Sequence, residues 1–356
     1  MNLQVEISNS VDEIEWNRTL TMSKDSSIYQ TTFWAQIYKN SYDSVPVFVS
    51  IRDSKSNLVG QLMSLIHKKM LWAHSHPISR LIGQGLNLNS ILTWQYGPII
   101  HDEENRKNIL DKLLVSINHV AKENNIAMIR GSTSPYSERN KEISNSTFKN
   151  QNYSYKPWST YLVNLKQNEE KFFQQLDKKT RYDIRKSEEK DLTFEETKDI
   201  DTIHELLMLK AESNKKARLK GLDRNKRFVL EHKQLIDLGH EHVFIIKHEN
   251  QIVGGIITPN FNGNIIQHGV TISSQRKLMV GTFLTWNILK FFLNKEFFYF
   301  DMGGFNPNPQ TKKEENIDFF KSKWNGIQAD FSFHDKILDR KKIKVSSLLR
   351  KFKDYN

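Results

Sequence analysis

The feature that most constrains the fold is a pattern of two β-rich runs around a polar turn, which occurs twice in the chain. The first copy, VFVSIRDSKSNLVGQLMSLI, begins at Val47, and the second, VFIIKHENQIVGGIITPN, begins at Val243. In both copies the second run opens with a Val-Gly pair, and runs of this kind around a polar turn are typical of a β-hairpin. Two halves on one plan are therefore expected, not a short-period repeat.

The order of the other segments favours an α/β (or α+β) fold in two domains, each a central mixed sheet flanked by helices. The stretch ENRKNILDKLLVSINHVAKENN has apolar residues at helical spacing, and IAMIRGSTSP follows as a strand. The polar segment PYSERNKEISNSTFKNQN is the most loop-like region, which indicates a boundary near residue 150. We expect domains over residues 1–152 and 153–330, and a basic extension over 331–356 that can pack back on the first domain.

Composition excludes several classes of protein. The 356 residues include no cysteine, so disulfides, thiol catalysis and zinc-thiolate sites are ruled out, and the histidines show no metal-ligand spacing. The formal charge of +11 favours anionic partners such as nucleic acid, although many basic proteins bind none. No signal-peptide pattern or membrane-spanning run is present, so a soluble, cytoplasmic protein is expected. The basic stretch DRKKIKVSSLLRKFKDYN predicts a solvated terminal helix, with a peripheral contact to an anionic membrane as the alternative.

A basic run, KKTRYDIRK, begins at Lys178 near the start of the second domain. On a helix Lys178, Arg181 or Tyr182, and Arg185 share a face, because residues three, four and seven apart lie together. Such a face either binds a phosphate group, which would relieve the repulsion between the cations, or is simply solvated and paired with the Glu188-Glu189 that follows. The sequence leaves both interpretations open.

A second constellation lies near the end of the second domain, in FFYFDMGG and FFKSKWNG. Asp301 ends an aromatic strand, and Gly303 and Gly304 permit a close backbone approach or a positive φ. The Asp can orient a ligand or cap the turn through its own backbone. Lys321 stands among aromatic residues, so its charge would act strongly on a developing oxyanion, unless it is a surface Lys whose stem covers apolar area.

The segment SSQRKLMVGTFLTW lies between a predicted strand and a predicted helix. With Gln275, Arg276 and Gly281, it resembles a degenerate form of the pyrophosphate-binding turn of acyl-CoA N-acyltransferases. That turn presents backbone N–H groups at a helix N-terminus, and glycines let the phosphates approach. Here one glycine remains and bulky residues fill the middle, which argues against tight CoA binding.

Taken together, these segments resemble the FemABX group of aminoacyltransferases, which are built from two GNAT-like domains. The resemblance spans most of the chain in the family's order, and KKTRYDIRK and DMGG…FK are its most specific parts. The other resembling segments are QTTFWAQIYK, WQYGPIIHD, STYLVNL, RNKRF, GVTISSQRKLMVGTFLTWNILK and FFKSKWNG. The paired-helix arm of some members is absent, because only a short segment separates Arg224 from Val243; this implies a compact monomer.

The resemblance implies transfer of an amino acid from aminoacyl-tRNA to an amine on a phosphate-bearing peptidoglycan precursor, with no cofactor. The Lys of the family's terminal FK motif matches Lys321, which would stabilise the tetrahedral oxyanion while Phe320 shapes the pocket. The family's phosphate-holding Arg matches Arg224, but Phe228 stands where a Tyr is expected.

The departures from the family pattern lie on the acceptor side. The Lys expected after the Trp-Ala pair is displaced, with Lys39 the nearest candidate. The Gly-Pro turn preceded by Tyr96 offers Asp102 as its acidic residue, but His101 occupies the nearer spacing. The donor chemistry is therefore better supported than peptidoglycan as acceptor.

Two other functions compete with this one. The first is an acyl-CoA-dependent N-acyltransferase that modifies an amino sugar or a small amine. The second, from another class, is a module that kept the fold, lost catalysis and binds RNA or a nucleotide through its basic face. Strong salt dependence of binding would indicate tRNA, because many phosphates are neutralised, whereas CoA binding would saturate with a small nucleotide.

Overall fold

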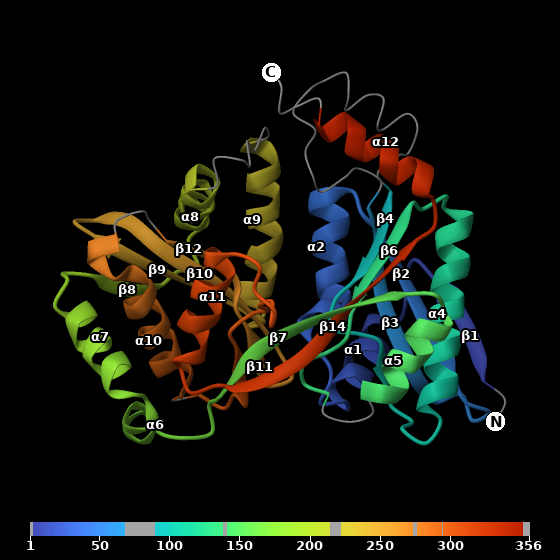
Figure 1. Ribbon diagram of the computed structural model, residues 1–356, viewed down its shortest axis with the longest axis horizontal. Coiled ribbons are helices and arrows are strands. Elements are labelled where there is room, and N and C mark those ends of the chain that lie inside the picture. The colour runs from blue at the N-terminus through green and yellow to red at the C-terminus, as the bar shows by residue number, and fades with distance from the viewer. Residues whose placement is uncertain are drawn as a thin grey trace. The chain divides into compact units, whose positions relative to one another are not determined.

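The computed structural model describes residues 3–67, 90–137, 141–213, 222–272, 276–293 and 295–351. They form two compact units, one made of Met1–Pro157 with Phe331–Asn356 and the other of Trp158–Asp330 (Figure 1). The predicted division at residues 152 and 153 lies a few residues before the break at Pro157. The segment after residue 330 belongs to the first unit.

The first unit is a mixed sheet with strand order β1-β2-β3-β4-β6-β14, in which β5 also pairs with β3 and, among the pairs of described strands, only β4 and β6 run parallel. Its strands are β1 (Gln4–Ser8), β2 (Val45–Arg52), β3 (Leu58–His67), β4 (Ile91–Trp94), β5 (Ile99–Ile100), β6 (Met128–Ser132) and the end of β14 (Ile327–Ile337). Its helices are α1 (Glu13–Thr21), η1 (Ile28–Gln30), α2 (Thr32–Tyr42), α4 (Arg106–Glu123), α5 (Lys141–Asn150) and α12 (Arg340–Lys351).

The second unit has strand order β7-β13-β11-β10-β9-β8, with β12 paired to β10; in the part of this unit that the structure describes, only β11 and β13 are parallel. Its strands are β7 (Ser154–Asn164), which starts in the first unit, β8 (Thr193–Glu196), β9 (Glu241–His248), β10 (Gln251–Phe261), β11 (Asn264–Ile266), β12 (His268–Ile272) and β13 (Tyr299–Asp301). Its helices are α6 (Glu169–Gln175), α7 (Lys178–Glu188), α8 (Ile200–Ser213), α9 (Leu222–Asp237), η2 (Arg276–Leu278), α10 (Val280–Leu293) and α11 (Lys312–Ser322).

Strand alternation explains why each sheet carries helices on two faces. In β9, Val243 and Ile245 belong to the core under α8 and α9, whereas Phe244 and Ile246 belong to the core formed with α10. Figure 1 shows α8 and α9 on one side of β9 and β10, and α10 with α7 on the other. Both predicted hairpins, β2-β3 and β9-β10, are confirmed, as is the α/β class with mixed sheets.

The predicted helix over ENRKNILDKLLVSINHVAKENN is α4, and the five apolar positions that indicated it are buried: Ile109, Leu110, Leu113, Leu114 and Ile117. The interpretation of PYSERNKEISNSTFKNQN as a loop is wrong, because α5 forms within it. This helix is stabilised by tertiary contacts. Phe148 is buried, its ring stacks on the ring of His334 with 3.7 Å between the centroids, and it also packs against Trp94 and Tyr153. The burial of Phe148 thus stabilises α5, although the polar sequence of this segment does not predict a helix.

Gln30, at the start of the QTTFWAQIYK segment, is a fully buried amide with its hydrogen-bonding groups satisfied. Its Nε2 donates to the carbonyls of Met63 (3.3 Å) and Gln95 (2.8 Å), and its Oε1 accepts from the Met63 N–H (2.9 Å). A Cβ on Gly97 would lie 2.8 Å from the Gln30 carboxamide, so this close packing requires glycine there. The hydrogen bonds of the Gln30 side chain therefore connect η1 to β3 and to the turn before β5.

Gln30→Leu should lower the free energy of unfolding by about 1–3 kcal/mol, because it leaves the Met63 N–H buried without this partner and removes the donor to the Gln95 carbonyl. The matched control is Gln36→Leu on the exposed side of α2, which we expect to change stability by less than about 0.5 kcal/mol. Urea unfolding followed by tryptophan fluorescence measures both. Equal losses in the two variants would contradict a special role for the buried amide.

Candidate functional site

The site is built at the end of β13, where the Asp301 carboxylate is fully buried. The Thr160 hydroxyl, on the neighbouring strand β7, donates to Asp301 Oδ1 at 2.5 Å, and the Gly303 N–H donates to the same oxygen at 2.8 Å. Of the two roles that the sequence left open, the carboxylate performs the capping of the turn that follows it. Thr160 was not singled out from the sequence, since a Thr in a β-strand carries no signal of its partner.

Gly303 has a φ of +75°, in the left-handed region that favours glycine. A Cβ at this position would also lie 3.3 Å from the Gln267 carbonyl oxygen and 3.6 Å from Lys321 Nζ. Both the backbone conformation and the close surroundings therefore require glycine. The turn aims the Gly303 and Gly304 carbonyls at the ammonium of Lys321.

Lys321 lies in the last turn of α11 and is buried, whereas Phe319, two residues before it, is 65% exposed. Its Nζ donates to the carbonyl oxygens of Gly303 (2.5 Å) and Gly304 (3.0 Å). An ammonium group has three donors. Among the described residues, Lys321 Nζ donates to these two carbonyls, so its third N–H remains for a ligand oxygen.

Burial lowers the pKa of Lys321 to about 8, against the opposing effects of the Asp301 and Asp318 carboxylates. Because Lys321 is buried and its Nζ donates to two backbone carbonyls, the interpretation of Lys321 as a snorkelling surface residue is wrong. Asp318 stands one turn earlier on α11 and accepts a hydrogen bond from the Tyr161 hydroxyl at 3.0 Å. Burial, and after it this hydrogen bond, raises the pKa of Tyr161 to about 12. Both carboxylates near the ammonium thus have a hydrogen-bond donor of their own.

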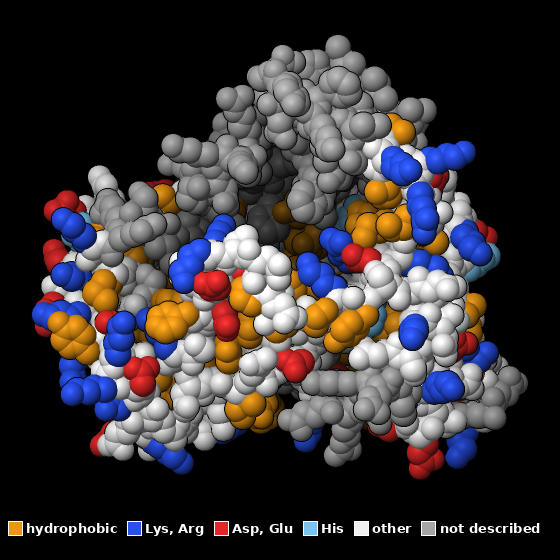
Figure 2. All heavy atoms as spheres, in the orientation of Figure 1, with side chains coloured by type: hydrophobic (Ala, Val, Ile, Leu, Met, Phe, Trp, Pro, Cys, Tyr) orange, Lys and Arg blue, Asp and Glu red, His pale blue; other side chains and the backbone are white. Residues whose placement is uncertain are grey.

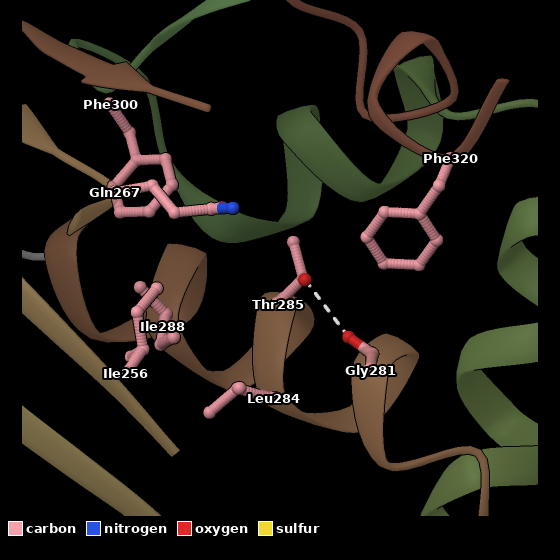
Figure 3. Close-up of a pocket in the computed structure, with 8 residues that line it drawn as sticks. All are labelled: Ile256, Gln267, Gly281, Leu284, Thr285, Ile288, Phe300 and Phe320. Carbon is pink, nitrogen blue, oxygen red and sulfur yellow. Dashed lines mark hydrogen bonds between the residues drawn. The ribbon is translucent and has the colours of Figure 1, made fainter. Parts of the chain in front are cut away.

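A small pocket lies beside this turn, between β10, β13, α10 and α11 (Figure 3). The Phe320 ring lies on one side of it and the Gln267 side chain points into it from the other. The Thr285 hydroxyl is used within α10, where it donates to the Gly281 carbonyl at 2.9 Å. Phe320 therefore lines the pocket while its neighbour Lys321 bonds to the turn beside it. Nothing in the sequence identified Gln267, which falls in the break between β11 and β12.

The basic run forms the helix α7, with Asp177 as its N-cap and Thr180, Ile184 and Ser187 as its buried face. Arg181 donates to the carbonyls of Gln174 (3.0 Å) and Leu176, at the end of α6. Arg185 is exposed and lies over the Phe173 ring, 5.6 Å from its centroid. Arg181 is thus occupied by local capping, and Arg185 keeps its charge available to solvent.

Charge is distributed broadly on the molecule. On the face shown in Figure 2, Lys and Arg side chains are spread among Asp and Glu side chains over much of the described surface. Among the described residues, no group of three His, Asp or Glu side chains lies together as metal ligands would. No helix in the described ranges is long and apolar enough to cross a membrane.

Among the acceptor-side candidates of the first unit, Tyr96 and Asp102 make local contacts and Lys39 is exposed. Lys39 is exposed on α2. Tyr96 is buried with a φ of +47°, and its ring packs against Tyr29, Tyr136 and Phe331. Asp102 accepts hydrogen bonds from the N–H (3.2 Å) and the side-chain amide (2.7 Å) of Asn105, just before α4.

Three other candidates fall outside what the structure describes. Arg224 and Phe228 have backbone positions in α9, but their side chains lie outside the described part of the chain. Gln275, in the segment that resembles a pyrophosphate-binding turn, also lies outside it. Of the predicted site residues, the structure brings together Asp301, Gly303, Gly304, Phe320 and Lys321.

No protein-family model matches the sequence, and no curated protein matches it. Solved structures match the fold over nearly the whole chain. The crystal structure of FemX is 12% identical with a TM-score of 0.69, covering 97% of this chain and 99% of that one. A tandem GNAT protein from the clavulanic acid biosynthesis pathway is 8% identical with a TM-score of 0.59, covering 94% and 98%.

The structure of L-PGS from Bacillus licheniformis is 11% identical with a TM-score of 0.51, covering 90% of this chain and 94% of that one. At sequence identities this low, the likeness between the structures shows a shared fold and nothing further. The predicted pair of GNAT-like domains is thereby confirmed, and the resemblance to the FemABX group is confirmed at the level of the fold. The chain has the tandem GNAT-like fold of FemX.

Proposed function

We propose that this protein is an acyltransferase that moves an aminoacyl group from aminoacyl-tRNA to an amine of a phosphate-bearing cell-envelope precursor. The observation that carries the proposal is the buried ammonium of Lys321, held by the Gly303 and Gly304 carbonyls beside a small pocket. A cation fixed in a partly desolvated site stabilises negative charge more strongly than one in water. Acyl transfer between an ester and an amine develops such a charge.

In the proposed reaction the acceptor amine attacks the ester carbonyl carbon, and the carbonyl oxygen becomes an oxyanion. The third N–H of Lys321 would donate to that oxygen while Phe320 positions the acyl group. The C–O ester bond then breaks, the tRNA hydroxyl leaves, and the proton released by the amine passes to it. An amide bond replaces the ester, without a cofactor.

The likeness to FemX and to the tandem GNAT protein supports acyl transfer as the class, by analogy of fold. Between the two donors, the segment before α10 favours tRNA over acyl-CoA. There Met279, not glycine, has a positive φ of +55°, and its carbonyl accepts from the N–H groups of Thr282 and Phe283. A bulky residue at a helix start leaves less room for a pyrophosphate. The proposal further implies a cytoplasmic monomer.

The donor class is tested by filter binding of a radiolabelled aminoacyl-tRNA pool at near-physiological salt, with uncharged tRNA and acetyl-CoA as competitors. Retention that uncharged tRNA competes only weakly supports the proposal. Loss of retention to acetyl-CoA would move the function to an acyl-CoA-dependent N-acyltransferase. Retention without product from any amine would instead support a non-catalytic RNA-binding module.

Lys321→Ala should lower kcat for aminoacyl transfer by roughly 10²–10³-fold, because the oxyanion loses its donor, while donor affinity stays nearly unchanged. The matched control is Lys312→Ala at the other end of α11, where the side chain is 81% exposed and we expect unchanged turnover. Single-turnover kinetics with labelled donor measures both. Normal turnover of the Lys321 variant would remove this residue from the mechanism.

The pH dependence distinguishes a cationic Lys321 from a neutral, proton-accepting one. With its pKa lowered to about 8, the ammonium form declines above that pH. The ratio of kcat/KM between wild type and Lys321→Ala should therefore fall about tenfold per pH unit above pH 8, since acceptor ionisation is common to both proteins. A ratio that rises up to pH 8 and then levels would indicate that Lys321 acts as a base.

A further inference from the structure

The ammonium of Lys321 is buried without a carboxylate in contact with it. Its Nζ donates to the carbonyl oxygens of Gly303 and Gly304, and among the described residues it forms no ion pair. Each carbonyl carries only a partial charge, so the two together offset incompletely the cost of burying a full positive charge. A buried lysine with no further compensation loses its proton near neutral pH. The charge of Lys321 therefore depends on ionised groups that lie farther away.

Two carboxylates from different elements act on this ammonium, Asp301 at the end of β13 and Asp318 on α11. Asp318 precedes Lys321 by three residues, which places the two side chains on one face of the helix. Burial lowers the pKa of Lys321 to about 8, and both carboxylates oppose this effect by favouring the charged form. Lys323, two residues further along, is paired elsewhere, since its Nζ lies 3.9 Å from Asp183 Oδ2 on α7.

The two carboxylates differ in what else they do. Asp301 accepts a hydrogen bond from the Gly303 N–H and shapes the turn, so its replacement would disturb the carbonyls that hold the lysine. Asp318 takes no part in that turn. Its Oδ1 accepts from the Tyr161 hydroxyl at 3.0 Å, and the Tyr161 ring is stacked on Phe305, with 4.9 Å between the centroids and 8° between the planes. The tyrosine therefore holds the Asp318 carboxylate in place.

We propose that Asp318 is a positioning residue for the proposed aminoacyl transfer, and that its carboxylate keeps Lys321 protonated from one helical turn away. A carboxylate in direct contact would occupy the third N–H of the ammonium and offset the charge that the oxyanion needs. From a distance, Asp318 favours the ammonium and leaves that N–H for a ligand oxygen. The inference rests on the proposed role of Lys321 and adds the group that sets the pH range in which this role is possible.

Asp318→Asn tests this role, because the amide keeps the shape of the side chain and an acceptor for the Tyr161 hydroxyl but removes the charge. The control is Glu315→Gln on the same helix, where an exposed carboxylate pairs with Lys312 at 2.7 Å. Lysine labelled with ¹³C at Cε reports the charge by NMR, and the Lys321 signal is assigned from its loss in Lys321→Arg.

The Lys321 signal should titrate with a midpoint near pH 8 in the wild-type protein and in Glu315→Gln. In Asp318→Asn the midpoint should be lower by about half a pH unit or more, because the ammonium loses the attraction of one carboxylate. Equal midpoints in all three proteins would overturn the proposal.

Kinetics show whether this charge serves the reaction. The ratio of kcat/KM between Asp318→Asn and wild type should be close to one at about pH 6.5, where Lys321 is charged in both proteins. At about pH 9 the ratio should fall to about one third, since a midpoint lower by about half a pH unit leaves about threefold less ammonium. A purely structural role would lower the ratio equally at both pH values, and that result would contradict the assignment.

These outcomes are separable from those of the proposed function, because the titration needs no substrate. If aminoacyl-tRNA supports Lys321-dependent transfer but Asp318→Asn leaves the Lys321 midpoint unchanged, the inference fails and the proposed function stands. If the midpoint falls in Asp318→Asn but no aminoacyl-tRNA supports transfer, the proposed function fails, while Asp318 remains the group that keeps the lysine charged.

Discussion

The buried carboxylate of Asp301 is the group on which the geometry of the second unit's site depends. It accepts hydrogen bonds from Thr160 and from the Gly303 N–H, and so fixes the turn after β13. That turn aims the carbonyls of Gly303 and Gly304 at Lys321. The negative charge also opposes the loss of the proton that burial promotes at the lysine. One carboxylate thus fixes the turn and, together with Asp318, favours the charged form of the lysine.

Each unit holds a glutamine amide in largely apolar surroundings, and the two amides differ in their hydrogen-bond partners. In the first unit the amide of Gln30 is fully satisfied by Met63 and Gln95, and its effect is to join segments distant in sequence. In the second unit the amide of Gln267 faces a pocket without a partner among the described residues. Satisfied buried amides stabilise a fold, whereas an open amide in an apolar pocket is suited to bind a ligand.

The local sequence pattern was sufficient to predict several of the secondary-structure elements. The hairpins β2-β3 and β9-β10 follow from β-rich runs around a polar turn, and the helix α4 follows from the helical spacing of its apolar residues. The helix α5 does not, since its polar sequence is stabilised by Phe148 stacked on His334 from the other end of the chain. The basic run likewise forms the predicted helix, but its Arg181 caps the end of α6, a contact that spacing along one helix cannot reveal.

By itself the sequence determined the two-part α/β plan and the grouping of Asp301, Gly303, Gly304, Phe320 and Lys321 in a terminal constellation, because turn-forming glycines and a lysine among aromatics are local signals. Only the tertiary structure decided what these residues do to one another. Lys321 lies on helix α11, its two carbonyl acceptors lie in the turn after β13, the hydroxyl of Thr160 lies on β7, and the amide of Gln267 lies just after β11. Their contacts arise from pairing between segments remote in sequence, and no one-dimensional pattern encodes the distance between such groups.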